Sequence, residues 1–126
     1  MRDCTFDYAV VRVVPRVERG EFFNVGLIVF CSEQAFLQAR FSLNSARLQT
    51  MAPEADEALV VEYLELIPRV CGGGAEAGPI GLLTQRERFH WLVAPRSTII
   101  QTSPVHCGLC EHPGAGLERL FRKFVG

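Results

Sequence analysis

The segment from Arg86 to His106 concentrates the side chains of this chain that could do chemistry. It reads RERFHWLVAPRSTIIQTSPVH and combines three arginines, two histidines and the only tryptophan with hydroxyl and amide side chains. Ligands are usually held by a few polar groups that converge on an apolar wall. Arginine with Ser/Thr hydroxyls and an aromatic ring can hold a phosphate, a carboxylate or a nucleotide base. This segment is therefore the first candidate for a binding or catalytic surface.

The candidate ligand- or partner-binding residues come from this segment and from one arginine near the N-terminus. They are Arg12, Arg86, Arg88, His90, Trp91, Arg96, Ser97, Gln101 and His106. Either histidine could act as a general base, because histidine titrates near neutrality. The same residues also fit a structural interpretation, in which they form a buried polar network and Arg12 pairs with Glu87 or another acid.

The stretch HCGLCEH, from His106 to His112, raises the question of a metal site. Its ligands would be Cys107, Cys110 and His112, since zinc prefers thiolate and imidazole in tetrahedral sites. His106 is adjacent to Cys107, so binding by both at once would be strained, and no second C-x-x-C occurs. A single C-x-x-C in a predicted loop is weak evidence for zinc. We therefore expect no metal and no other cofactor.

Motifs of familiar catalytic sites are absent from the sequence. It contains no Walker or Rossmann glycine loop, no HExxH and no GxSxG. The run Gly72 to Gly74 is followed by no lysine and preceded by no predicted strand, so it does not qualify as a phosphate loop. No activated nucleophile accompanies the Arg86 to His106 segment. We therefore expect a protein that is not an enzyme.

Length, composition and charge limit the class of protein. A chain of 126 residues is long enough for one hydrophobic core and too short for two, so we expect a single domain over residues 1–126. Hydrophobic residues make up 48% and charged residues 21%, which is typical of a folded protein. The formal net charge of −1 provides no general attraction to nucleic acid. Nucleic acid is therefore not an expected partner.

The sequence also predicts where the protein is found. No apolar stretch approaches the roughly 20 residues that cross a bilayer. Asp3, Asp7 and Arg12 interrupt the early apolar run, and no signal-peptide cleavage site follows it. The five cysteines are an odd number without a secretory signal, which favours reduced thiols. We expect a cytoplasmic protein without a membrane partner.

Three runs of β-branched and aromatic residues predict strands in the first third of the chain. They are Phe6 to Pro15, Phe22 to Cys31 and Phe36 to Leu43. The first run is apolar on both alternating faces, as in a central strand, and the third alternates like a half-buried edge strand. Short polar links join the runs, which indicates an antiparallel meander. Gly26 lies inside the second run, where glycine usually marks a bulge or a close approach of another backbone.

Helical signals follow the meander. Asn44 is a suitable N-cap for a short turn through Met51. Pro53 suits the start of a longer helix, which Gly72 to Gly74 would end. Pro68 would end or kink its last turn. Apolar residues recur at helical spacing and are expected to face the sheet: Leu59, Tyr63, Leu66, Ile67 and Val70.

The last third of the chain predicts a further strand and helix. Thr84 to Glu87 has the spacing of a capping box, so a short helix starts at Thr84, with a strand through Phe89 to Val93 as the alternative. Ser97 to Gln101 predicts a strand. Pro113 begins a clearly amphipathic C-terminal helix. Together these elements predict an α+β fold, in which an antiparallel sheet, made of the N-terminal three-stranded meander plus the later strand, carries two main helices packed on one face.

Two long motif blocks resemble an uncharacterised bacterial family known as domain-of-unknown-function 3037. The blocks are FDYAVVRVVPRVERGEFFNVGLIVFC and GPIG…RERFHWLVAPRSTIIQTSPVH, and the resemblance extends from Phe6 through the last helix. The signature positions are Arg12, Arg16, Asn24, Gly26, Arg88, His90, Trp91, Arg96, Ser97, Gln101 and His106. The resemblance implies a small stand-alone protein with no assigned activity or catalytic residues. Genes of the family often neighbour one for a HipA-like serine/threonine kinase, which implies a partner or regulator.

Two functions follow from these observations. The first is a non-enzymatic accessory or regulatory domain that binds a protein partner, such as a HipA-like kinase, through the Arg86 to His106 surface. It predicts a flatter apolar patch, with Trp91 and Phe89 exposed and arginines at its rim. The alternative is a small enzyme or ligand binder for a phosphorylated or nucleotide-like substrate. It predicts a concave pocket into which a histidine and at least two arginines point.

Overall fold

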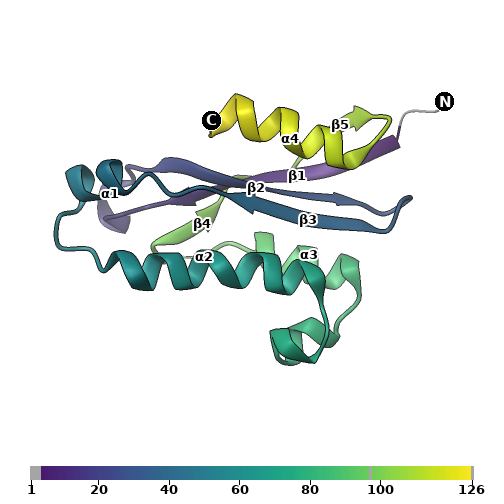
Figure 1. The fold of residues 1–126 in the computed structure, drawn as a ribbon, viewed down its shortest axis with the longest axis horizontal. Coiled ribbons are helices and arrows are strands. Elements are labelled where there is room, and N and C mark those ends of the chain that lie inside the picture. Colours follow the sequence, from purple (N-terminus) through teal and green to yellow (C-terminus); the bar gives the residue numbers. More distant parts are fainter. Residues whose placement is uncertain (1–3, 97, 126) are drawn as a thin grey trace.

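The computed structural model describes residues 4–96 and 98–125, without the side chain of Cys110. Its strands are β1 (Cys4–Val13), β2 (Phe23–Cys31), β3 (Phe36–Phe41), β4 (Ile100–Thr102) and β5 (His106–Cys110). Its α-helices are α1 (Ser45–Met51), α2 (Glu57–Gly72), α3 (Gln85–Val93) and α4 (Pro113–Phe124). Short 3₁₀ turns occupy the connections: η1 (Val17–Arg19), η2 (Ala75–Ala77) and η3 (Pro79–Leu82). The predicted α+β class is confirmed, and Figure 1 shows the sheet as a central layer between α4 and the pair α2 and α3.

The sheet is antiparallel, with strand order β3-β2-β1-β4. This arrangement confirms the predicted meander and the addition of a later strand to it. That strand was predicted over Ser97 to Gln101, and β4 begins instead at Ile100, while Ser97 lies outside the described residues. The strand β5 was not predicted, because its segment reads as a loop. It pairs with Cys4 to Tyr8 of β1, along the same edge as β4, and so supplies partners for main-chain groups that β4 does not reach.

Gly26 explains how β2 and β3 approach each other. A Cβ atom at this position would lie 2.6 Å from the carbonyl oxygen of Arg40 on β3. The register between β1 and β2 also shifts between Val11 and Arg12, next to the pairing of Val11 with Gly26. Of the two sequence-based interpretations of this glycine, the close backbone approach is therefore confirmed, and the irregularity in register lies directly beside it.

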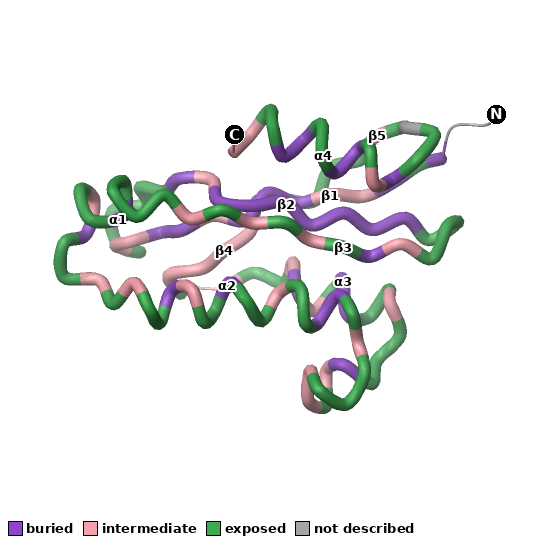
Figure 2. Tube along the Cα trace, in the orientation of Figure 1, coloured by how far each residue is buried: buried purple, intermediate pink, exposed green. Residues whose placement is uncertain are grey.

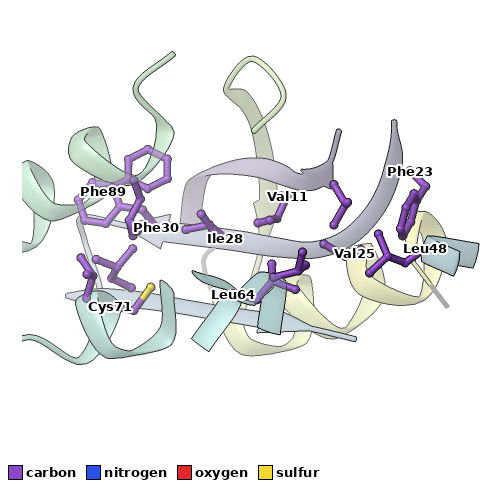
Figure 3. Close-up of a cluster of buried hydrophobic side chains, with 14 residues drawn as sticks. Val11, Phe23, Val25, Ile28, Phe30, Leu48, Leu64, Cys71 and Phe89 are labelled. Atoms are coloured by element: carbon purple, nitrogen blue, oxygen red, sulfur yellow. The ribbon is translucent and has the colours of Figure 1, made fainter. Parts of the chain in front are cut away.

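The two longer helices lie on opposite faces of the sheet, so their predicted placement on one face is wrong. Helix α4 packs its apolar stripe on one face, where the buried cluster includes Phe6, Leu27, Val29, Leu117, Leu120 and Phe121. Helices α2 and α3 cover the other face, with the cluster that Figure 3 draws, including Ile28, Phe30, Leu64, Cys71 and Phe89. Consecutive residues of a strand point to opposite faces, and Leu27 and Ile28 are both fully buried. Each face therefore needs its own covering layer.

Helix α2 is rotated relative to the sequence-based prediction. Leu59, Tyr63 and Leu66 were expected to face the sheet, but they are 42%, 46% and 37% exposed. Val70, which was expected to face the sheet, is buried, and Ile67 packs partly buried against the core. The other buried residues of the helix form a second stripe, made of Val60, Leu64 and Cys71. Figure 2 shows buried turns of α2 alternating with exposed ones along its length. An apolar stripe is thus left at the surface, on the flank of the helix.

The helix ends follow local capping chemistry. The side chain of Asn44 accepts a hydrogen bond from the amide of Arg47, which confirms the predicted start of α1. Helix α2 starts later than predicted, because Asp56 rather than Pro53 caps it, and it continues past Pro68 to Gly72. Thr84 and Glu87 form the complete capping box of α3, so the alternative of a strand there is wrong. Among the described residues, none of the helices combines the length and apolar character needed to cross a membrane.

Candidate functional site

A cavity of about 250 Å³ opens on the α2 face of the sheet, between α2, α3 and β4. We call it the α2–β4 groove. Its lining residues are Tyr63, Leu66, Ile67, Trp91, Leu92, Arg96, Thr98, Ile100, Gln101 and Thr102. Three of the sequence-predicted site residues, Trp91, Arg96 and Gln101, therefore come together here. The groove exists because α2 packs mainly on β3, at one side of the sheet, and leaves the region under β4 less covered.

The walls of the groove come from three elements. Helix α2 contributes Tyr63 and Leu66, two of the exposed apolar residues that its rotation leaves outside the core. Trp91 lies near the end of α3 and is half-buried. The predicted exposure of Phe89 is wrong, because its ring is buried in the core on the α2 face. Ile100 of β4 forms the far wall and also packs against the core beneath. An aromatic and aliphatic surface of this kind suits an apolar group of a ligand or partner.

Arg96 has a positioning role in the groove. Its guanidinium lies 4.6 Å from the centre of the Trp91 ring. It also donates hydrogen bonds to the carbonyl oxygens of Trp91, Leu92 and Ala94, in and just after the last turn of α3. A helix leaves its last carbonyls without partners, and a cation is favourable at this end. Burial lowers the pKa of Arg96. Because its donors are directed to main-chain carbonyls, Arg96 fixes Trp91 in place.

The polar residues of β4 are also engaged within the chain. The side-chain amide of Gln101 donates to the carbonyl of Thr98. The hydroxyl of Thr102 donates to the carbonyl of Val93, which ties β4 to the end of α3. These bonds fix the shape of the groove and leave its apolar residues as the surface it offers.

The other arginines do not converge on the groove. Arg12 alternates with Val11 and Val13, which face α2, so it lies on the opposite face, with its guanidinium 4.1 Å from the centre of the Phe22 ring. Among the described residues, Arg12 forms no ion pair with Glu87 or with another acid, and the carboxylate of Glu87 accepts from the amide of Thr84. The guanidinium of Arg86 lies over the Phe30 ring at 5.4 Å.

Arg88 is a buried cation and is only 8% exposed. Its Nε has no hydrogen-bond partner among the described residues. It packs against Gly73, at the end of α2, and lies near the thiol of Cys71. Burial raises the pKa of Cys71 to about 12, although the charge of Arg88 acts in the opposite direction. The thiol therefore stays neutral and gives Arg88 no anionic partner.

The two histidines are separated by the sheet. His90 is exposed on α3. His106 is exposed on β5, where its ring lies 5.5 Å from the ring of Tyr8 on the α4 face. Neither lines the groove. The structure therefore does not assemble the histidine and paired arginines that an acid–base site for a phosphorylated substrate would need.

The C-x-x-C segment lies on β5, away from the groove. Cys107 is exposed, and its thiol donates to the carboxylate of Asp7 at 3.3 Å. His112 is exposed just before α4, and the side chain of Cys110 lies outside the described part of the structure. Within that part, no three His, Cys, Asp or Glu side chains gather as a metal site would require.

The sequence profile of a family described as "protein of unknown function (DUF3037)" matches residues 8–125. The chain belongs to this family. The matched range includes every residue of the α2–β4 groove, so the groove is part of the family domain. No curated protein and no solved structure matches the chain.

Sequence reasoning about this DUF3037 protein missed most of the groove. The residues not singled out are Tyr63, Leu66, Ile67, Leu92, Thr98, Ile100 and Thr102. The sequence signal for the groove lay in α2, which has more apolar residues than one face of the helix can bury. Leu59, Tyr63 and Leu66 recur at intervals of three or four residues, as one stripe, and Val60 and Leu64 begin a second one. Two stripes on one helix predict two apolar contacts.

A prediction for this DUF3037 protein concerns Cys107. Asp7 raises the pKa of Cys107, through its hydrogen bond first and its negative charge second. Replacing Asp7→Asn should lower this pKa, so a larger fraction of thiolate exists near neutral pH and alkylation becomes several-fold faster. Mass spectrometry of iodoacetamide labelling at Cys107, followed across pH, gives the midpoint. Glu62→Gln removes a distant carboxylate as the control, and an unchanged midpoint in Asp7→Asn would contradict the prediction.

Proposed function

We propose that this protein is a non-enzymatic accessory protein that binds a protein partner through the α2–β4 groove. The observation that carries the proposal is the apolar surface at the groove, where Tyr63 and Leu66 are exposed beside Trp91. Leaving large apolar side chains in water is unfavourable, and contiguous exposed ones mark interaction sites. Aromatic residues are also enriched among the residues that dominate binding energy.

The chemistry of the groove favours binding over catalysis. Within the described residues, its lining contains one arginine and one tyrosine, and no histidine, cysteine or carboxylate. General acid–base catalysis most often uses a histidine, and also carboxylates, within hydrogen-bond reach of the substrate. The one arginine is already bonded to the carbonyls of α3. A small enzyme for a phosphorylated substrate is therefore the weaker of the two hypotheses.

We propose a HipA-like kinase as the partner and the cytoplasm as the compartment. The support for this partner is the association that family resemblance implies, because genes of the family often neighbour one for such a kinase. The apolar groove supports a protein partner in general. A kinase that inserts an apolar side chain between Tyr63 and Trp91 would bury surface that the isolated chain exposes.

The test uses the purified protein and a purified HipA-like kinase. Biolayer interferometry should detect binding, and Leu66→Glu should weaken it by about tenfold or more, as expected for a central apolar contact. Leu109→Glu is the matched control, because Leu109 is 62% exposed on β5. It pairs with Thr5, and the groove residue Thr102 pairs with Val11, which places the two roughly 20 Å apart along β1. Equal affinities for the two variants, or no binding of the kinase by the unaltered protein, would reject the proposal.

A further inference from the structure

Among the described residues, the groove is bordered by a strand that has no partner strand on one edge. Strand β4 pairs with β1 on one side and ends the strand order on the other. Figure 1 shows β4 on the side of the sheet toward α2, and its three residues line the groove. An edge strand presents main-chain N–H and C=O groups that another chain can pair with.

The hydrogen bonds of the ladder show which residues face this open edge. The amide of Val14 donates to the carbonyl of Ile99, and the amide of Ser103 donates to the carbonyl of Val10. Hydrogen-bonded pairs recur at every second residue of an antiparallel ladder. Gln101 is thus the residue of β4 bonded to β1, and the main-chain groups of Ile100 and Thr102 are directed outward. The carbonyl of Ile100 accepts a hydrogen bond there from the hydroxyl of Thr98, an exposed residue, so an added strand would share or displace this hydroxyl.

A strand that paired with Ile100 and Thr102 would lie beside the groove. Ile100 packs toward the core on the α2 face, and the hydroxyl of Thr102 bonds to Val93 of α3 on that face. In an antiparallel partner, the residues bonded to Ile100 and Thr102 point their side chains to the same face as these two. Alternate side chains of an added strand would therefore project toward Tyr63, Leu66 and Trp91.

Strand β3, at the opposite end of the strand order, is less suited to this role. Strand β3 is flanked by α2 on one face, and its Arg40 pairs with Glu118 of α4 on the other. Charged side chains on an edge strand discourage pairing with a further strand. The three residues of β4 carry no charge.

Carboxylates near the groove indicate that the bound segment of the partner carries basic residues at its ends. Four carboxylates surround Leu59 on α2 and at its N-cap: Asp56, Glu57, Glu62 and Glu65. Glu62 neighbours both Leu59 and Leu66 on the helix surface, at intervals of three and four residues. No ion pair within the described residues involves these four carboxylates. Lysine or arginine in a partner would be attracted to them.

We propose that the occupant of the α2–β4 groove is an extended polypeptide segment of a protein partner, which adds as a strand to β4. Its alternate apolar side chains enter the groove, and its basic residues lie against α2. This inference rests on the proposed function and specifies how the partner is held. It belongs to the known mode of recognition in which main-chain bonds give affinity and side-chain pockets give specificity.

The test uses a short synthetic peptide in which leucine alternates with threonine, with lysines at both ends. The chain has a single tryptophan, Trp91, which lies in the groove, so its fluorescence reports binding of a peptide that has none. The expected result is a saturable change in Trp91 emission. Replacing the terminal lysines by glutamates should weaken binding, most strongly at low salt.

Two N-methylated versions of this peptide separate strand addition from simple apolar contact. Methylating the leucine amides blocks one edge of the peptide, and methylating the threonine amides blocks the other, while the side chains stay the same. If the peptide adds to β4 as an antiparallel strand, we expect the affinity of the leucine-methylated peptide to fall by about tenfold or more. The affinity of the threonine-methylated peptide should be nearly unchanged. A selective loss for the threonine-methylated peptide supports strand addition in the parallel direction.

The failure of this inference is distinguishable from the failure of the proposed function. Equal affinity for both methylated peptides, or no response of Trp91 to any of the peptides, overturns strand addition. The proposed function then still stands if Leu66→Glu, but not Leu109→Glu, weakens binding of the kinase. A selective loss with one methylated peptide supports strand addition whatever the identity of the natural partner.

Discussion

Truncating Leu64→Ala should destabilise this protein by about 2–5 kcal/mol, whereas Leu66→Ala should cost less than about 1 kcal/mol. The two leucines lie two positions apart on α2, so the chemical change and the helix propensity are matched. Leu64 is fully buried against the sheet, and its removal leaves a cavity in the core on the α2 face. Leu66 is 37% exposed and borders the α2–β4 groove, so its truncation removes little buried surface.

Urea unfolding followed by circular dichroism measures both free energies of unfolding. The comparison tests the rotation of α2, on which the existence of the groove depends. Had Leu66 faced the sheet, as the sequence suggests, the larger cost would belong to Leu66→Ala. That reversed order would remove the structural basis of the proposed binding surface.

Gly73→Ala should be about 2 kcal/mol more destabilising than Gly78→Ala. The two glycines have nearly the same backbone geometry, with φ 72 and ψ −173 at Gly73 and φ 76 and ψ −163 at Gly78. Alanine is strained to a similar degree in both places, at about 1–3 kcal/mol. The surroundings differ, because a Cβ atom at Gly73 would lie 2.1 Å from Nη1 of Arg88, and one at Gly78 would meet nothing within 4 Å.

The side chain of Arg88 is expected to resist this displacement because it is buried between α3 and the end of α2. A double-mutant cycle isolates the contact. In an Arg88→Ala background, Gly73→Ala should cost about as much as Gly78→Ala, as measured by urea unfolding. If the excess cost at Gly73 persists without Arg88, the clash is not its cause.

The elements of the fold could largely be predicted because their signals are local. A strand is marked by β-branched and aromatic residues, and the capping box at Thr84 and the N-cap at Asn44 depend on hydrogen bonds within one turn. Gly26 could be interpreted in the same way, because a missing side chain is meaningful wherever two backbones approach. Strand β5 escaped prediction, since its partner Cys4 to Tyr8 lies about one hundred residues earlier in the chain.

The placement of the helices shows where local patterns stop being sufficient. The apolar character of both faces of β1 was visible in the sequence, and burial on both faces requires a layer on each side. A central strand that is apolar on both faces therefore excludes the predicted packing of both main helices on one face. Neither amphipathic helix carries a mark that assigns it to one face, so the assignment depends on how the whole chain packs.

The residues of the candidate site also divide into those that the sequence indicates and those that only the packing of the chain places there. Trp91, Arg96 and Gln101 could be selected from the sequence because polar and aromatic residues gather in one segment. Their partners Tyr63 and Leu66 could not, because helix α2 has two apolar stripes that fit its period equally well. The sequence determined the elements, their caps and the density of polar groups near Trp91, since these depend on neighbours along the chain. Only the tertiary structure decided which stripe of α2 became core and which became surface, because that choice depends on packing against distant strands.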